Sequence, residues 1–409
     1  MSNAEVVPDD LLDAVYAEQP TAPDLAIRAE KKTKFAPWHH PVKQVVRSKQ
    51  WADLTHRLLV DSRSPDQQKT LRYFTLPGAD LLDVRVLAEA LAPLGTKIEY
   101  FGFNAAPSSS MEGGAMAGVP DASFSAESAL RQAGQITNDA LVLTDRLEDI
   151  AIPGSQAANQ LSQRQHFDVI NIDGCDHLGY VPNGRQSSTF AALEKLLGHQ
   201  LLFRKPWLLF ITTRADAKLL GPHTVKMQGA ILENIRDHGE SFNPALADCI
   251  GANIATLQSD LNAAWSTQSD TFLKVYSVGL GKYLLHFFHG QHNLSADVEL
   301  ASVYTYPIQQ TEPDMLSLAF RIIPHPLNVQ PATAGTTSVR SPLEPEQGVK
   351  LAARAKRMWN IGIAVNEIDD LRSSAIDGTK KLLDAANYDL SAWQDWLAKH
   401  TTRAMQVEI

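Results

Sequence analysis

Short apolar runs alternate with stretches of helical periodicity from about residue 70 to residue 325 of this 409-residue chain. Such alternation is typical of βαβ units, whose right-handed crossovers place helices on both faces of a parallel sheet. We therefore predict five parallel strands with helices between them. The strands are expected within residues 71–78, 97–106, 139–149, 167–174 and 206–214, and the helices within residues 80–95, 125–133, 155–165 and 189–202, with Ser125 as a candidate N-cap.

The pattern changes after the fifth predicted strand. Residues 222–264 are typical of helices, and antiparallel strands are expected within residues 271–290, 297–307 and 315–326. Gly279 and Gly281 indicate a hairpin turn or a bulge inside the first of these strands. The predicted fold class is α/β, a doubly wound, mostly parallel sheet with antiparallel C-terminal edge strands.

The segments on either side of this region differ from it in composition. We expect residues 1–66 to form an N-terminal acidic and basic extension and residues 67–326 to form the α/β domain. Residues 327–346 are rich in Pro, Thr, Ser and Gly, which predicts a linker. Residues 347–409 have helical spacing and predict a small helical segment that either caps the sheet or binds a protein partner.

The composition is that of a folded, globular protein. The chain is 44% hydrophobic and 20% charged, which suffices for at least one large core. It contains neither an apolar run long enough for a membrane helix nor the basic start and apolar block of a signal peptide, so we expect a cytoplasmic location and no membrane partner. Its two cysteines, Cys175 and Cys249, support neither a disulfide framework nor a cysteine zinc site.

The net charge of −9 hides a separation of charge near the N-terminus. Residues 1–27 contain six acidic residues and no lysine or arginine, whereas residues 28–57 contain eight basic residues against two acidic ones. Histidines and aromatic residues lie among the basic residues, a mixture that suits phosphate contact and base stacking. Nucleic acid is therefore one candidate partner of residues 28–57, and pairing of these charges within the fold is the other interpretation.

The fourth predicted strand ends at a cluster of side chains that can carry protons or bind a metal ion. The run FDVINIDGCDH, residues 167–177, is apolar until Asp173, which is followed by Asp176 and His177. Ligands of open α/β sheets bind outside the carboxyl ends of the strands, so these three residues predict a ligand-facing site.

The order of these elements resembles that of class I S-adenosylmethionine-dependent methyltransferases over about residues 70–325. The resemblance implies a Rossmann-like fold that holds S-adenosylmethionine across the ends of the first four strands. In that family a Gly-rich turn lies under the methionine part, an acid after the second strand meets the ribose hydroxyls, and an acid or polar residue after the third strand lies near adenine. Carried over to this sequence, the implied cofactor-binding residues are Thr75, Pro77, Gly78, Asn104, Thr144, Asp145 and Asp173, with Asn104 where the family has an acid.

The segment IDGCDH is also similar to a pattern found after the fourth strand of some small-molecule O-methyltransferases. In those enzymes the acid can bind a divalent cation that helps to deprotonate a substrate hydroxyl. Here Asp173 would be a metal ligand or cofactor contact, Asp176 a second ligand or base, and His177 a general base. The competing interpretation is that Asp176 caps a turn and His177 packs as an ordinary loop histidine.

Two functions follow from these patterns. The first is methyl transfer from S-adenosylmethionine to an oxygen or nitrogen nucleophile, with Asp176 or His177 removing a proton. The second is a catalytically degenerate, nucleic-acid-binding or assembly protein that uses residues 28–57 and the C-terminal helices. Serine hydrolase, P-loop and dinucleotide-dependent oxidoreductase chemistry lack their motifs. The segment WHHP, residues 38–41, is expected to be extended, and the histidines of FFHGQH are expected at a strand end and turn.

Overall fold

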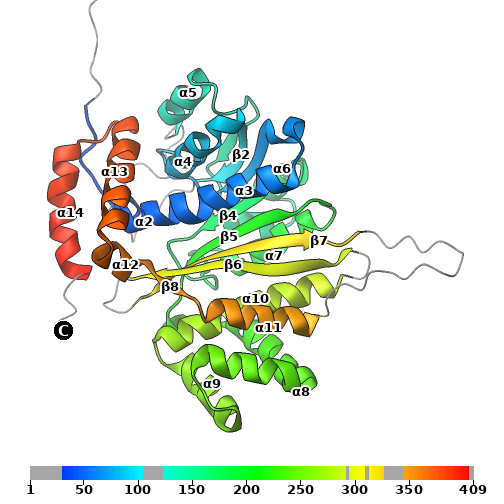
Figure 1. Cartoon of the computed structure of the whole chain (residues 1–409). Helices are drawn as coiled ribbons and strands as arrows, with labels where there is room; N and C mark the ends of the chain where they lie inside the picture. Colours follow the sequence, from blue (N-terminus) through cyan, green and yellow to red (C-terminus); the bar gives the residue numbers. More distant parts are fainter. Residues whose placement is uncertain (1–29, 105–122, 292–293, 309–312, 327–343, 405–409) are drawn as a thin grey trace, which may run out of the picture.

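A computed structural model describes residues 30–104, 123–291, 294–308, 313–326 and 344–404 of the chain (Figure 1). An eight-stranded sheet runs through these residues in the order β3-β2-β1-β4-β5-β7-β6-β8. Its strands are β1 (Thr70–Thr75), β2 (Lys97–Phe103), β3 (Leu141–Leu143), β4 (Val169–Asp173), β5 (Trp207–Arg214), β6 (Ala296–Tyr306), β7 (Met315–Pro324) and β8 (Trp359–Asn360).

The first five strands are parallel, as predicted. Strand β1 lies between β2 and β4, and the chain builds outward to β3 on one side before it returns to build β4 and β5 on the other. This reversal places the topological switch point between β1 and β4. Strand β7 is antiparallel to both β5 and β6, which confirms the expected antiparallel strands at the C-terminal side of the sheet.

Alternate side chains of the central strands point to opposite faces of the sheet, and each face has its own core. Ile170 and Ile172 of β4 belong to one buried cluster, whereas Val169 belongs to the other. The helices on these faces include α2 (Pro41–Val45), α3 (Asp53–Ser62), α4 (Leu82–Leu91), α5 (Phe124–Gln132), α6 (Gln156–Ser162), α7 (Thr189–Gln200), α8 (Pro222–Ile250), α9 (Leu257–Ser266) and α10 (Asp270–His289).

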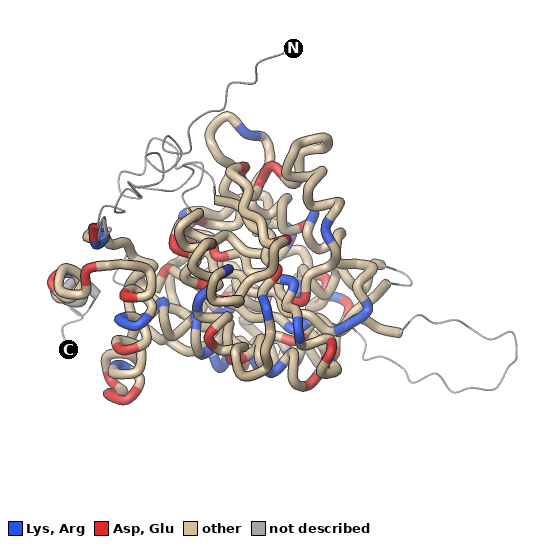
Figure 2. The backbone as a smooth tube through the Cα atoms, turned by 90° about the horizontal axis from the view of Figure 1, so that it is seen from above, with Lys and Arg blue, Asp and Glu red and all other residues tan. Residues whose placement is uncertain are grey.

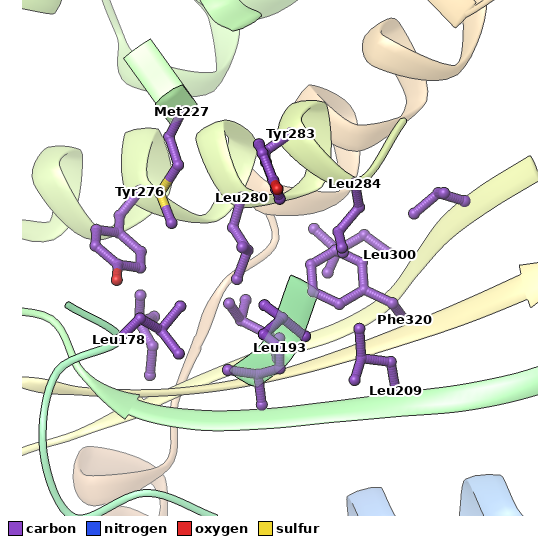
Figure 3. Packing of buried hydrophobic residues seen from close by; sticks show 14 of the residues in the cluster. Leu178, Leu193, Leu209, Met227, Tyr276, Leu280, Tyr283, Leu284, Leu300 and Phe320 are labelled. Carbon is purple, nitrogen blue, oxygen red and sulfur yellow. The ribbon is translucent and has the colours of Figure 1, made fainter. Parts of the chain in front are cut away.

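The C-terminal part adds α11 (Glu344–Ala355), α12 (Ile361–Glu367), α13 (Asp369–Ala385) and α14 (Leu390–Ala404). In Figure 1, helices α8 to α11 lie below the sheet and α2 and α3 lie above it. Figure 3 shows Leu280 and Leu284 of α10 pointing toward Leu209 of β5 and Phe320 of β7. Each such buried leucine stabilises the fold by about 2 kcal/mol relative to an exposed one.

The prediction of a strand and turn over residues 271–290 is wrong, because these residues form helix α10 (Asp270–His289). This helix is buried around most of its circumference, so it lacks the polar stripe that would reveal helical periodicity. Its glycines mark close packing: a Cβ on Gly279 would lie 3.1 Å from Met227, and one on Gly281 would lie 2.9 Å from Leu351.

The terminal segments contact the same sheet. Trp51 lies in the π-helical segment η2 (Val46–Ala52) and packs on Phe210 of β5, with ring centroids 6.5 Å apart. Helix α11 packs against α8, α10 and β6. Helix α11 begins at Glu344, inside the predicted linker, and residues 327–343 lie outside the described residues. The predicted domain boundaries stay predictions.

Smaller expectations need correction as well. The N-cap of α5 is Ser123, and Ser125 lies inside this helix. The segment WHHP is not extended throughout, because a 3-10 turn covers Pro37–His39 and α2 starts at Pro41, which leaves only His40 with an extended backbone. Among the described residues, none of the helices combines the length and apolar character needed to cross a bilayer.

Candidate functional site at the carboxyl edge of the sheet

The predicted cofactor residues follow the carboxyl ends of parallel strands and therefore share one edge of the sheet. Thr75 ends β1, Asn104 follows β2, Thr144 follows β3 and Asp173 ends β4. The backbone N–H of Asn104 donates to the carbonyl oxygen of Leu143 at 2.9 Å, which joins the ends of β2 and β3. The topology thus brings these residues to one edge, as the sequence predicts.

At the turn after β1, Thr75 is buried and Gly78 is exposed to solvent. The side chain of Thr75 is fully buried, and its hydroxyl donates to the carboxylate of Asp83. The hydroxyl of Tyr73 donates to the same carboxylate at 2.9 Å. Gly78 is exposed, and a Cβ added there would meet nothing within 4 Å. Thr75 therefore supports the turn, while the backbone at Gly78 remains approachable.

Gly102 of β2 is a residue that sequence reasoning missed. A Cβ at this position would lie 2.7 Å from the ring of Pro77 and 2.8 Å from the carbonyl oxygen of Thr75. The absence of a side chain at Gly102 is what lets the turn after β1 lie across β2. The signal in the sequence was a lone glycine inside an otherwise bulky strand.

The residues after β2 and β3 are more open to solvent than Thr75. Asn104 and Asp145 are half-buried, and Thr144 is exposed. An amide and a carboxylate at this edge can donate to and accept from a ligand's hydroxyl or amino groups.

Asp173 contacts a lysine that comes from the N-terminal extension. The Lys43 ammonium, on α2, forms an ion pair with the Asp173 carboxylate and lies 4.7 Å from the centroid of the Trp51 ring. Burial lowers the pKa of the Lys43 ammonium, and the negative charge of Asp173 opposes that shift. Asp173 is thus tied to α2 within the protein.

Arg47 lies beside this ion pair and is also buried. Burial lowers the pKa of its guanidinium, and the nearby carboxylates Asp173 and Asp83 oppose the shift. We refer to Lys43, Arg47, Asp83 and Asp173 as the Lys43 cluster. It contains two cations and two carboxylates, so its charges balance.

Asp176 is largely used to shape the loop after β4. Its carboxylate accepts a hydrogen bond from the backbone N–H of His177 at 2.8 Å. Its carbonyl oxygen accepts from the backbone N–H of Arg214 at 3.2 Å and from the hydroxyl of Thr213 at 3.1 Å. These bonds fix the loop against the end of β5 and so place His177.

His177 faces a second histidine, which sequence reasoning did not select. His223, at the second residue of α8, has its ring centroid 5.9 Å from that of His177. The Nδ1 atoms of both rings are buried without a hydrogen-bond partner in the described part of the chain. We call these two residues the histidine pair.

Gly179 explains how the two rings approach each other. A Cβ at Gly179 would lie 2.3 Å from Nδ1 of His223 and 3.3 Å from Nδ1 of His177. Only a residue without a side chain lets both rings pack here. Burial lowers the pKa of His223 to about 4 and also lowers the pKa of His177, so both imidazoles are neutral at pH 7.

The basic segment is partly paired within the fold. Besides Lys43, Lys32 forms an ion pair with Asp80, and Lys31 lies 3.9 Å from Asp384 of α13. Lys43 and Arg47 are buried, so neither can contact nucleic acid as the protein stands. The acidic residues 1–27 lie outside the described residues, and Figure 2 shows both signs of charge interspersed along the rest of the chain.

Other histidines serve local roles. His39 is buried, and the ring of His40 accepts a hydrogen bond from the N–H of Val42 at the start of α2. His286 and His289 lie in the last turn of α10, not at a strand end, and His292 lies outside the described residues. Within the described ranges, no group of three or more His, Cys, Asp or Glu side chains is placed to hold a metal ion.

A protein-family model described as PP_RS20740-like matches residues 32–398. The chain belongs to this family. The match spans the segment from Lys32, the sheet and most of α14. A search of curated proteins found no match.

Among solved structures, the chain is similar to the SAH-bound Podospora anserina methyltransferase PaMTH1. The two chains are 10% identical, the similarity covers 80% of this chain and 100% of that one, and the TM-score is 0.26. The sheet of this chain has the five parallel strands and the late antiparallel strands that the sequence predicts.

Proposed function

We propose that this chain transfers a methyl group from S-adenosylmethionine to an oxygen or nitrogen nucleophile. The observation that carries the proposal is the switch point between β1 and β4, with polar residues following β1 to β4 on one edge of the sheet. Ligands of doubly wound sheets bind at such points, outside the carboxyl ends of the strands.

The cofactor side of the site would consist of the ends of β1 to β3. The open space at Gly78 allows close approach to the backbone of the first turn, which Pro77 holds against β2. The amide of Asn104 can hydrogen-bond ribose hydroxyls, and Thr144 and Asp145 can meet the adenine side. Bound there, S-adenosylmethionine supplies a methyl group on a positively charged sulfur.

Thr75 and Asp173 have a different part in this proposal. Each is already engaged inside the protein, Thr75 by Asp83 and Asp173 by Lys43. We assign them to positioning the turn after β1 and the end of β4. This assignment keeps both residues in the site but makes their contact with the cofactor secondary.

The acceptor side would be the loop after β4. His177 is neutral at pH 7, and a tautomer with the proton on its buried Nδ1 leaves Nε2 able to accept another. That Nε2 would take the proton that the acceptor's O–H or N–H gives up on receiving the methyl group, with S-adenosylhomocysteine as the leaving group. Alignment of the two reactants supplies most of the acceleration, and proton removal adds to it.

Calorimetry with the full chain tests the cofactor side. We expect saturable binding of S-adenosylmethionine and S-adenosylhomocysteine, and a roughly tenfold weaker affinity for Asn104→Ala and for Asp145→Ala, the loss expected for one hydrogen bond of about 1.4 kcal/mol. Asp139→Ala, an exposed acid before the amino end of β3, is the matched control and should bind as the unaltered chain does. No saturable heat at millimolar ligand would refute the proposal.

A further inference from the structure

A cavity lies at the other end of the sheet from the methyl-transfer site. Its volume is about 460 Å³, within the range of small-molecule sites. It includes Leu208, which pairs with Val169 at the start of β4, whereas Asp173 pairs with Thr212 near the end of β5. The cavity is therefore distinct from the site proposed above.

Three parts of the chain that are far apart in sequence form the cavity. Helix α3 comes from the N-terminal extension, β5, β6 and β7 come from the sheet, and α11 comes from the C-terminal segment. Both terminal additions to the α/β fold thus meet here, around the outer edge of β6. Neither addition could form this cavity without the other.

The outer edge of β6 is held by side chains of α11. The amide oxygen of Gln347 accepts a hydrogen bond from the backbone N–H of Val298 at 2.9 Å. The guanidinium of Arg354 donates from Nε to the carbonyl oxygen of Ala301 at 2.7 Å. These bonds satisfy backbone groups in the part of β6 that β8 does not pair and fix the wall between β6 and α11, so the cavity is preformed.

The apolar lining residues of the cavity differ in how much surface they offer. Leu208, Leu58 and Leu351 are only 2%, 3% and 1% exposed, whereas Leu54 and Ala301 are half-buried. The remaining apolar lining residues are Val298 and Leu300. Leucines from a helix on each side and from the strands between them favour an aliphatic occupant over a compact, fully hydrated ion.

The charged residues that line the cavity have a net positive charge. Of the four cations, Arg354 bonds to a carbonyl oxygen and Arg321 lies 3.9 Å from Glu299. Of the three acids, Asp297 accepts from Gln347 at 2.6 Å and lies 2.6 Å from the His325 ring. Arg57 and Lys350 form no ion pair with any residue in the described ranges, and Asp61 is the one acid left to offset them.

We propose that this cavity binds an aliphatic chain with an anionic head, such as a medium-chain carboxylate. The chain lies on the leucines, and the head lies between Arg57 of α3 and Lys350 of α11. Binding here would tie the N-terminal extension to the C-terminal segment. The proposal does not depend on methyl transfer.

Calorimetry of the full chain with octanoate tests it, with 1-octanol, octylammonium and acetate as probes of head charge and tail. We expect saturable octanoate binding and at least tenfold weaker binding of 1-octanol and octylammonium. Acetate should show no saturable binding at concentrations up to 10-fold the octanoate Kd. The double variant Arg57→Glu, Lys350→Glu should weaken octanoate binding at least tenfold. Lys195→Glu, an exposed lysine of α7 outside the cavity, should leave it unchanged.

Three outcomes would overturn the proposal. One is the absence of saturable octanoate binding to the unaltered chain. Another is equal affinity for octanoate and 1-octanol, which would mean that the head charge is not recognised. The third is unchanged octanoate affinity in a folded double variant, with its fold checked by circular dichroism and thermal unfolding.

Discussion

The Lys43 cluster and the histidine pair both lie where β4 ends, yet the first is built from opposite charges and the second from neutral rings. In the Lys43 cluster, two buried cations face two carboxylates, and Asp83 also accepts from two hydroxyls. In the histidine pair, two neutral rings face each other and neither Nδ1 has a partner in the described residues. Opposite charges of this kind hold structure together, whereas buried polar atoms without a hydrogen-bond partner mark a place where a ligand can bind.

Removing the lysine of the Lys43 cluster should have the largest effect on stability. Lys43→Met keeps most of the side chain's volume but leaves the Asp173 carboxylate without its ion-pair partner. We expect the free energy of unfolding to fall by about 3 kcal/mol, as for other broken buried pairs. Urea unfolding followed by circular dichroism measures the change.

Lys49→Met is the matched control, because Lys49 is an exposed lysine of η2, the segment that directly follows α2. It should change the free energy of unfolding by no more than about 0.5 kcal/mol. If Lys43→Met were as mild as this control, Arg47 alone would be neutralising Asp173, and the cluster would not depend on Lys43.

This contrast also explains what the sequence could predict. The end of β4 was predictable, because Val169, Ile170 and Ile172 form a short apolar run that stops at Asp173, and topology then places the neighbouring strand ends beside it. The partners Lys43 and His223 were not predictable, because they come from α2 and α8, and their contacts depend on tertiary packing rather than on any local spacing. Helix α10 was misread for a related reason: burial on nearly all sides removes the periodicity that separates a helix from a strand.

Acid should destabilise the protein through the histidine pair. The pKa of His223 is about 4 in the folded protein and 6.5 in the unfolded chain, so the unfolded chain binds more protons as the pH falls below 6.5. The stability from burying a neutral His223 is complete above pH 6.5 and is progressively lost down to pH 4. Between pH 7 and pH 5 this single group should cost about 2 kcal/mol.

Comparison with His223→Asn isolates that contribution from those of other buried histidines. The loss of unfolding free energy between pH 7 and pH 5 should be about 2 kcal/mol smaller in this variant. His238→Asn, at an exposed histidine further along α8, should leave the pH dependence as it is. If the unfolding free energy of His223→Asn and of the unaltered chain changed equally with pH, His223 would not resist protonation in the folded state.

Gly179→Ala should have a smaller effect on stability. Comparing it with Gly78→Ala distinguishes the loop after β4 from the turn after β1. Its methyl group would meet the His223 ring at 2.3 Å, so the loop after β4 must shift, at a cost of about 1.5 kcal/mol. Gly78→Ala, in the turn after β1, places its methyl group in open space and should stay within about 0.5 kcal/mol of the unaltered chain. Thermal unfolding of both variants at pH 7 measures the difference. Equal, small effects would mean that His223 can move aside freely, in which case the close approach of the two rings is not what holds His177 at the end of β4.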